Sequence, residues 1–339
     1  MKIKRFRHSF LKKDLIDLTN VILNGQIAIG DNVKIFEKKI GEIVNHKNVC
    51  VVSNGFSAIF LSLKALGIKK GDLVALPIAS TCHSVRNAVL ASGANPLFLD
   101  FKPNLPISDY KDFRISSDKL KAIISINHFG IIDDVKHYNL GIPVIEDSSQ
   151  SFGITNDFSD RVCTISSFYA TKIINSVDGG VIYSKSKKII EKCLDLRSYQ
   201  NKFDDNLRYN FKLSNVNATL GLSQLNAYER LIKRRKLISE EYFESIKKSD
   251  LIDKTIYQKI KIFYKFPIVF KEDLNQKEIF KLLSSLKIPC TKELVLNKSI
   301  SKGFPAATSL VNRFYSLPIY PSLTRKEINY IIKQIKRVF

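Results

Sequence analysis

Short β-rich segments alternate with helix-like segments through most of this 339-residue chain. The apolar, β-branched runs lie at residues 49–53, 73–76, 96–100, 121–127 and 143–147. Strands joined by helical crossovers run parallel, and such a sheet is buried between helices on both faces. The alternation therefore predicts the α/β class, with a mostly parallel sheet between two layers of helices.

Helix signals fill the segments around these runs. In residues 31–45, Val33, Phe36, Ile40 and Val44 recur at helical intervals, which is typical of an amphipathic helix. Turn and apolar patterns also predict helices at residues 12–23, at 56–66, from 84 onward, at 187–199 and from 213 onward.

The chain changes character near residue 238. The later segments predict a β run at residues 259–270, a helix at 276–286, a strand at 288–294 and a closing amphipathic helix at 325–338. We therefore expect a large domain over residues 1–237, which includes the polar N-terminal lead-in, and a small α+β domain over residues 238–339.

Lys172 stands between a hydroxyl-rich apolar segment and an Asp-Gly-Gly turn, in the stretch 166–180. This arrangement is typical of an amine presented at the end of a strand. Desolvation and nearby positive charge lower the pKa of a lysine, so that its neutral amine can form a Schiff base with a carbonyl group. The alternative is a solvated surface lysine, since the chain contains many lysines.

Two carboxylates, Glu146 and Asp147, end the strand predicted at residues 143–147. In an open α/β sheet, ligands bind at the carboxyl ends of the strands. Pyridoxal 5′-phosphate needs a lysine for its aldehyde, a carboxylate that keeps its pyridine nitrogen protonated, and donors for its phosphate. Asp147, Ser167 and Lys172 follow one another in an order that suits this cofactor.

A phosphate site is predicted where the strand at 49–53 meets the helix at 56–66. Asn54 and Gly55 form the turn between them, and Ser57 adds a hydroxyl in the first helical turn. Free N–H groups and the helix dipole favour an anion at such a helix start.

The charge balance needs an interpretation, because 54 Lys and Arg face 32 Asp and Glu, which gives a formal net charge of +22. Such an excess can mark a nucleic-acid surface, or it can attract an anionic substrate. The charges are spread along the chain and no nucleic-acid-binding signature occurs. We therefore expect small-molecule substrates and no nucleic-acid partner.

The five cysteines show no close spacing, which predicts neither a disulfide framework nor a metal site. The N-terminal region has no signal-peptide core, and no apolar run approaches the ~18 residues of a membrane span. We therefore expect a cytoplasmic protein without a membrane partner.

Several stretches resemble, in this order, the DegT/StrS family of sugar aminotransferases. They are residues 53–72, 87–100, 143–153, 166–172 and 209–225, and residues 316–328 resemble the family's closing block. The likeness extends from about Gly30 to the end of the chain. The family consists of pyridoxal phosphate enzymes of fold-type I, so the resemblance implies a seven-stranded, mostly parallel sheet and a small C-terminal α+β domain.

The resemblance also implies a role for individual residues. Lys172 would hold the cofactor aldehyde and later move a proton, and Asp147 would pair with the pyridinium nitrogen. Gln150 would donate a hydrogen bond to the phenolic oxygen of the ring, and Ser167 would bind the phosphate together with Ser57.

At three other positions, the residue can be compared with the one that is usual in the family. Phe56 stands where a threonine is usual, so the phosphate contact is assigned to Ser57 and to the backbone of Gly55. Asn210 matches the asparagine that reaches the phosphate of the neighbouring subunit, which implies a homodimer with shared active sites. Lys212 stands where an arginine is common, which weakens a bidentate contact there.

The residue that stacks on the cofactor ring also departs from the family. No Phe, Tyr or Trp occurs between Ile78 and Leu90, so His83 is the candidate and Cys82 the alternative. A helix-capping or core histidine is the other interpretation of His83. His128 is likewise either part of the pocket floor or a structural residue.

The expected reaction moves an amino group from an amino acid, glutamate by resemblance, to a keto-sugar that is most simply nucleotide-linked, for surface polysaccharide or another glycan. No histidine follows His137, so the histidine-bearing C-terminal loop of many relatives is absent. Some members of the fold dehydrate deoxysugars with a histidine at the lysine position, and Lys172 argues against that reaction. A regulator that binds pyridoxal phosphate or nucleic acid is the remaining alternative.

Overall fold

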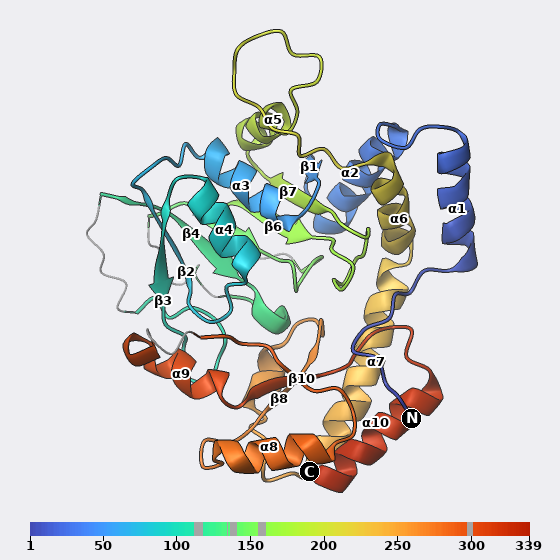
Figure 1. The fold of residues 1–339 in the computed structure, drawn as a ribbon, viewed down its shortest axis with the longest axis vertical. Coiled ribbons are helices and arrows are strands. Elements are labelled where there is room, and N and C mark those ends of the chain that lie inside the picture. The colour runs from blue at the N-terminus through green and yellow to red at the C-terminus, as the bar shows by residue number, and fades with distance from the viewer. Residues whose placement is uncertain (112–117, 134, 136–140, 155–160, 297–300) are drawn as a thin grey trace.

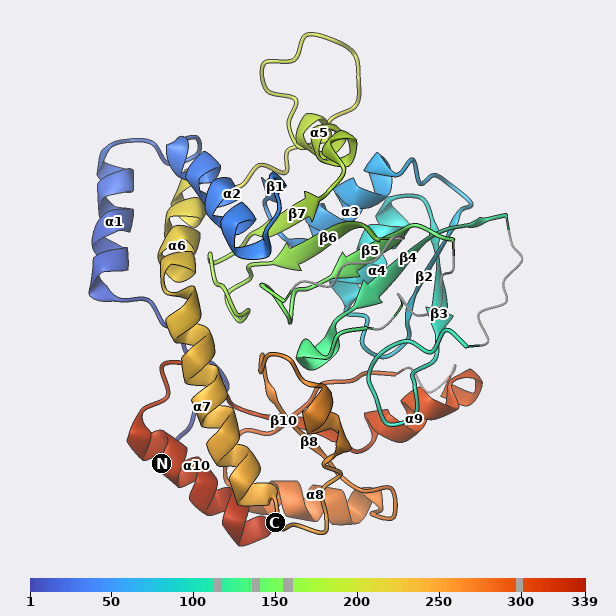
Figure 2. The ribbon, with the colours of Figure 1, turned by 180° about the vertical axis from the view of Figure 1, so that it is seen from behind.

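The computed structural model describes residues 1–111, 118–133, 135, 141–154, 161–296 and 301–339. Figure 1 shows a large sheet covered by helices and, below it, a smaller sheet with helices of its own. Helix α7 (Tyr228–Ile246) runs from one to the other, as the view from behind in Figure 2 also shows.

The large sheet has seven strands in the order β1-β7-β6-β5-β4-β2-β3. Neighbours run parallel from β3 through β6, while β7 is antiparallel to both β6 and β1. This confirms the α/β class and the mostly parallel, seven-stranded sheet. The strands are β1 (Asn48–Val52), β2 (Leu73–Pro77), β3 (Asn95–Leu99), β4 (Leu120–Ile126), β5 (Val144–Asp147), β6 (Arg161–Ser167) and β7 (Gly180–Ser184).

Helices cover both faces of this sheet (Figure 1). The central strands therefore bury side chains on both sides, and Ile123 and Ile124 are both fully buried. Double burial explains why the strands read as continuous apolar runs rather than alternating ones. One face carries α3 (Gly55–Ala65), α4 (His83–Ala91) and α5 (Lys187–Leu196), and the other carries α2 (Asp31–Val44) and α6 (Asn215–Asn226), with α1 (Lys12–Leu23) beside α6.

The small sheet has three antiparallel strands in the order β8-β10-β9. It packs with helices around one apolar core, which confirms the small α+β unit after the large sheet. Its elements are β8 (Phe266–Val269), α8 (Gln276–Ser285), β9 (Thr291–Lys292), α9 (Pro305–Val311), β10 (Phe314–Leu317) and α10 (Arg325–Val338), and short 3₁₀ turns are η1 (His128–Gly130), η3 (Thr255–Lys259) and η4 (Ser301–Gly303).

The small unit differs from the sequence prediction in its strands. The β run predicted at 259–270 forms a strand only at β8, and the strand predicted at 288–294 shrinks to β9. The reason lies before β8, where Ile262 and Tyr264 are buried in the apolar cluster of the large sheet rather than in the small one. Their apolar pattern therefore reports packing between the two halves of the molecule and not a strand.

The long helix predicted from residue 213 is in fact two helices, since α6 ends at Asn226 and α7 begins at Tyr228. The expected domain boundary at residue 237 falls inside α7, so it stays a prediction. The N-terminal segment lies on the small sheet, where Ile3 joins the apolar core. Within the described residues, no helix combines the length and the apolar character needed to cross a bilayer.

Candidate active site

The carboxyl ends of the central strands open into a cavity of about 1020 Å³ that also contacts the small sheet. Ligands bind at this edge in open α/β sheets. Seven of the residues predicted for the site line this cavity: Gly55, Phe56, His83, Asp147, Gln150, Ser167 and Lys172. Ser57 and Asn210 are not among the described residues of its wall.

Lys172 lies in a loop that backbone hydrogen bonds close on itself. The N–H of Phe168 donates to Gly179 O at 2.8 Å, and the N–H of Lys172 donates to Tyr169 O at 2.8 Å. The Lys172 side chain enters the cavity, and its Nζ lies 5.2 Å from the centre of the Tyr264 ring. The loop therefore presents the amine to the cavity rather than to bulk solvent.

Asp147 and Glu146 end β5 side by side but face opposite sides, because successive strand residues alternate. Glu146 accepts hydrogen bonds from Asn127 and Thr164, and it pairs with Arg161 at 3.1 Å. Asp147 faces the cavity and accepts a hydrogen bond from the Ser149 N–H at 2.9 Å.

Burial raises the pKa of Asp147, whereas the hydrogen bond from Ser149 and the charge of Lys172 lower it. A buried carboxylate with one hydrogen-bonded oxygen suits a cationic N–H partner, since a charge-assisted bond would offset the desolvation. The carboxylate that the sequence predicted for the pyridinium nitrogen thus lies in the same cavity as Lys172.

Gln150 holds His128 in one tautomer. The Gln150 Oε1 accepts the Phe129 N–H at 2.8 Å, so its Nε2 donates toward His128 Nδ1 at 3.1 Å. The proton of the neutral imidazole is then on Nε2, which is buried and has no hydrogen-bond partner among the described residues. Burial and, to a smaller extent, the charges of Lys265 and Lys172 lower the pKa of His128 to about 3.

The start of α3 meets the end of β6 closely. A Cβ added at Gly55 would lie 2.9 Å from the Cβ of Ser167, so glycine allows this approach. The Ser167 hydroxyl accepts the Tyr169 N–H at 3.3 Å, and the Ser167 N–H donates to Ser149 Oγ at 2.9 Å. A helix start and a hydroxyl at one place suit a phosphate.

Ser57 takes part in a different contact. Its N–H and its hydroxyl both donate to the Asn54 Oδ1, at 2.8 and 2.9 Å, and its side chain is fully buried. Asn54 thus acts as the N-cap of α3 and draws the Ser57 hydroxyl beneath the first turn. The structure does not bring this hydroxyl to the cavity wall with the other predicted residues.

His83 and Cys82 both line the cavity at the start of α4. His83 is the first residue of the helix and is exposed, so it is neither a core histidine nor the N-cap, which is Cys82. Phe56, at the cavity wall, stacks on Phe60 with ring centres 6.1 Å apart. The choice of His83 as the ring-stacking residue stays a prediction.

Asn210 lies in an exposed segment outside the cavity and forms an isolated bridge with Ser198. Lys212 follows it, with its Nζ 5.4 Å from the centre of the Tyr199 ring. Both residues therefore stay predictions as contributors to a neighbouring subunit's site.

The small-sheet wall of the cavity contains residues that the sequence did not single out. Lys265 Nζ lies 2.5 Å from Glu293 Oε2, and the Ser316 hydroxyl donates to Glu293 Oε1 at 2.6 Å. Both lysines approach the ring of Tyr264, with Lys172 Nζ and Lys265 Nζ at 5.2 and 5.4 Å from its centre. No motif or regular spacing marks these residues, because they lie in irregular segments that flank very short strands.

The fold and the cavity together define a class of protein. Lys172 can hold an aldehyde, Asp147 a protonated ring nitrogen, and Gly55 with Ser167 a phosphate, all from one wall of one cavity. This donor set fits pyridoxal 5′-phosphate. The class is therefore that of the fold-type I pyridoxal phosphate enzymes.

Residues 10–336 match the DegT/DnrJ/EryC1/StrS aminotransferase family. The chain is 27% identical over 343 residues to the GDP-perosamine synthase of Escherichia coli O157:H7, with 91% of each chain covered. It is 30% identical over 296 residues to the UDP-4-amino-4,6-dideoxy-N-acetyl-beta-L-altrosamine transaminase of Campylobacter jejuni, covering 79% of this chain and 76% of that one.

A solved structure of a sugar aminotransferase from Streptococcus pneumoniae, Spr1654 in its PMP form, has the same fold. Its TM-score is 0.89 with 19% identity, and the match covers 100% of this chain and 98% of the other. The chain belongs to the DegT/DnrJ/EryC1/StrS aminotransferase family. It is an aminotransferase whose cofactor is pyridoxal 5′-phosphate.

Proposed function

We propose that the protein transfers the amino group of glutamate to a keto-sugar carried on a nucleoside diphosphate, for a surface polysaccharide or another glycan. The observation that carries this proposal is that Lys172 and Asp147 face one cavity of about 1020 Å³. This volume is at the upper end of small-molecule sites, so a sugar can lie beside the cofactor. The names of the GDP- and UDP-linked relatives support a nucleotide-linked acceptor.

The chemistry divides between the cofactor and the chain. Bound pyridoxal phosphate supplies an aldehyde that takes up an amino group and a ring that accepts electrons. Lys172 Nζ would hold that aldehyde at rest, and its free amine would move a proton from the donor carbon and to the acceptor carbon. The Asp147 carboxylate stabilises the positive charge on the ring nitrogen.

Other residues of the wall position the same group. Gln150, already fixed by Phe129 and His128, has a second amide hydrogen for the phenolic oxygen. The net charge of +22 attracts a diphosphate-bearing substrate from solution.

A homodimer with shared active sites belongs to the same proposal. Asn210 lies outside the cavity of its own chain, which supports a role at a neighbouring subunit. A reducing cytoplasm is supported by the five cysteines, all of which are free thiols.

The test begins with purified protein and pyridoxal phosphate, which should give a visible absorbance band that borohydride reduction fixes to Lys172. L-glutamate should then convert the bound cofactor to its amine form, and a panel of nucleotide-linked keto-sugars should yield an amino sugar by mass spectrometry. A sugar product that loses oxygen without gaining nitrogen would point to dehydration instead. Protein that stays colourless with added cofactor would count against any such reaction.

A further inference from the structure

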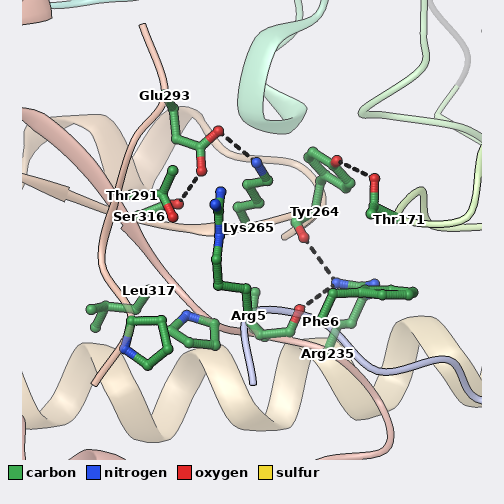
Figure 3. A pocket seen from close by; sticks show the side chains of 13 residues that line it. Arg5, Phe6, Thr171, Arg235, Tyr264, Lys265, Thr291, Glu293, Ser316 and Leu317 are labelled. Atoms are coloured by element: carbon green, nitrogen blue, oxygen red, sulfur yellow. Dashed lines mark hydrogen bonds and ion pairs between the residues drawn. The ribbon is translucent and has the colours of Figure 1, made fainter. Parts of the chain in front are cut away.

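A second, smaller cavity of about 230 Å³ adjoins the first one on the small-sheet side. Figure 3 shows the residues that line it. The two cavities share Tyr264, Lys265 and Glu293 as lining residues. The two cavities therefore adjoin at these three side chains. The small cavity has room for a short chain with a charged end but not for a nucleotide.

Three cations and one carboxylate line the small cavity: Arg5, Arg235, Lys265 and Glu293. Lys265 and Glu293 pair with each other at 2.5 Å. Figure 3 shows Arg5 reaching from the N-terminal segment into the cavity toward Glu293, while Arg235 lies at its base. The cavity therefore carries an excess of positive charge.

Arg235 is a buried cation whose hydrogen-bond partners are neutral backbone carbonyl groups. Arg235 is only 2% exposed, and its Nη1 donates to the backbone carbonyls of Phe263, Tyr264 and Ile319. Within the part of the chain that the structure describes, it forms no ion pair and its Nε has no hydrogen-bond partner. Burial lowers the pKa of Arg235 to about 10. An anion in the cavity would offset the desolvation of this charge.

The N-terminal segment is fastened on both sides of Arg5. Ile3 is buried in the small-sheet core, and the Lys4 carbonyl accepts a hydrogen bond from Tyr320 at 3.2 Å. Arg7 donates to both carboxylate oxygens of Glu327, at 3.1 and 2.8 Å. These contacts hold the backbone of the segment in place, so Arg5 enters the cavity from a fixed position.

We propose that the small cavity binds the distal carboxylate of a dicarboxylic amino donor through Arg5, Lys265 and Arg235, and so selects such donors over monocarboxylic ones. The inference rests on the proposed function, since it names the donor of that reaction. Lys172 and Lys265 approach the same Tyr264 ring. The amine of a short donor can therefore meet the site of Lys172 while its carboxylate turns toward Lys265 and Arg5.

A binding measurement tests this without turnover. Glutarate has both carboxylates and no amine, and pentanoate is its monocarboxylic match. Glutarate should raise the melting temperature of the cofactor-loaded protein more than pentanoate does, and Arg5→Gln and Lys265→Gln should each reduce that difference. Lys4→Gln removes the same charge from the same segment, outside the cavity, and should leave the difference unchanged.

Glu293→Gln should increase the affinity for glutarate, whereas the two previous substitutions should decrease it. This change removes the carboxylate that pairs with Lys265, so glutarate should bind more tightly than to the unaltered protein. Equal stabilisation by glutarate and pentanoate, or a glutarate effect that Arg5→Gln leaves intact, would overturn the assignment. Inorganic phosphate that stabilises in place of glutarate, with the same dependence on Arg5, would overturn it as well and assign the cavity to a phosphate group.

A kinetic measurement separates this inference from the proposed function. Glutamate and norvaline have five-carbon chains and differ in the distal carboxylate. The ratio of their kcat/KM values in the donor half-reaction should favour glutamate, and Arg5→Gln should lower that ratio by about tenfold or more. Equal use of both donors would refute the carboxylate site while leaving an aminotransferase. Failure of every amino acid to react would refute the function, whatever glutarate binding shows.

Discussion

On the large-sheet side of the active-site cavity, Asp147 and Ser167 end two parallel strands, whose hydrogen-bonded ladder fixes their positions. On the small-sheet side, Tyr264, Lys265 and Glu293 lie in irregular segments beside strands of two and four residues. The first wall is therefore set by a buried sheet, and the second by irregular segments that flank very short strands. Rigid elements place reacting groups more accurately than loops do.

This difference suggests a division of labour between the two walls. The large-sheet wall carries the groups that fit the cofactor, whereas the small-sheet wall carries the charges that a substrate meets. Loops tolerate substitution better than buried strands, so selectivity can change on one side without disturbing the chemistry on the other. Changes on the large-sheet wall should alter kcat, and changes on the small-sheet wall should alter selectivity.

The largest effect should come from Lys172→Ala. Without the amine, we expect kcat to fall by at least about 10²- to 10⁴-fold, because both the aldehyde anchor and the proton carrier are lost. Steady-state kinetics and borohydride reduction measure the two losses. Lys188→Ala removes an exposed lysine of α5 and should keep full activity. If Lys172→Ala turned over substrate at the unaltered rate, the groups of the large-sheet wall would not carry the reaction.

The next largest effects come from the two carboxylates of β5. Asp147→Asn should lower kcat by about ten- to hundredfold, because it weakens a charge-assisted hydrogen bond to the cofactor, and should leave the free energy of unfolding nearly unchanged. Glu146→Gln should do the reverse. It removes the negative charge from a buried ion pair with Arg161, and the free energy of unfolding should fall by about 3 kcal/mol.

Activity assays together with urea denaturation distinguish these two neighbours. If Glu146→Gln abolishes activity in a protein of normal stability, the assignment of roles along β5 is reversed. If both variants lose stability equally, the strand end is structural throughout.

The sequence predicts the large-sheet wall because its signals are local. Apolar runs set the strands, and the residue after each run must lie at the ligand edge of a parallel sheet. These signals predict that Asp147, Ser167 and Lys172 belong to one site. Ser57 differs from the prediction because its hydroxyl donates to Asn54, the N-cap of α3. A hydrogen-bond choice between adjacent side chains leaves no periodic trace.

The small-sheet wall was not predictable for a different reason. Its strands are too short for a two-residue alternation to be recognised, and the apolar residues before β8 pack against the other half of the molecule. Lys265 and Glu293 are far apart in sequence, and a chain with many lysines gives no reason to choose one of them. Their pairing exists only once the tertiary structure has formed.

The pKa of His128 depends on charges from both walls of the cavity, and it gives a prediction about stability and pH. Its folded-state pKa is about 3, against an ordinary value of 6.5, because of burial and then the charges of Lys265 and Lys172. The unfolded chain therefore binds a proton at pH values where the folded chain does not. The stability contributed by neutral His128 is complete above pH 6.5 and is lost as the pH falls toward about 3, at about 1.4 kcal/mol per pH unit.

His128→Asn keeps an acceptor for Gln150 and removes the titrating group. From about pH 7 to about pH 5, the unaltered protein should lose about 2 kcal/mol more unfolding free energy than the variant. Denaturant titrations at the two pH values measure the difference. Parallel loss of stability in both proteins would show that His128 takes up its proton as readily in the folded state as in the unfolded one.

The smallest effect concerns Tyr264, the residue shared by both cavities. Burial raises its pKa, but the charges of Lys172 and Lys265 outweigh that effect and leave the pKa below its ordinary value. Its hydroxyl is 3.5 Å from Thr171 Oγ1, at the limit of a hydrogen bond, whereas its ring faces both ammonium groups. The ring should therefore matter more than the hydroxyl.

Two substitutions separate the ring from the hydroxyl. Tyr264→Phe keeps the aromatic face and should change kcat/KM by less than about twofold, because the lost contact is weak. Tyr264→Leu removes the face and should lower kcat/KM by about two- to fivefold, which corresponds to a weak cation–π contact. If Tyr264→Phe lost as much activity as Tyr264→Leu, the hydroxyl would belong with the proton-carrying groups. A catalytic group would then come from the small-sheet wall, and the two walls would share the chemistry.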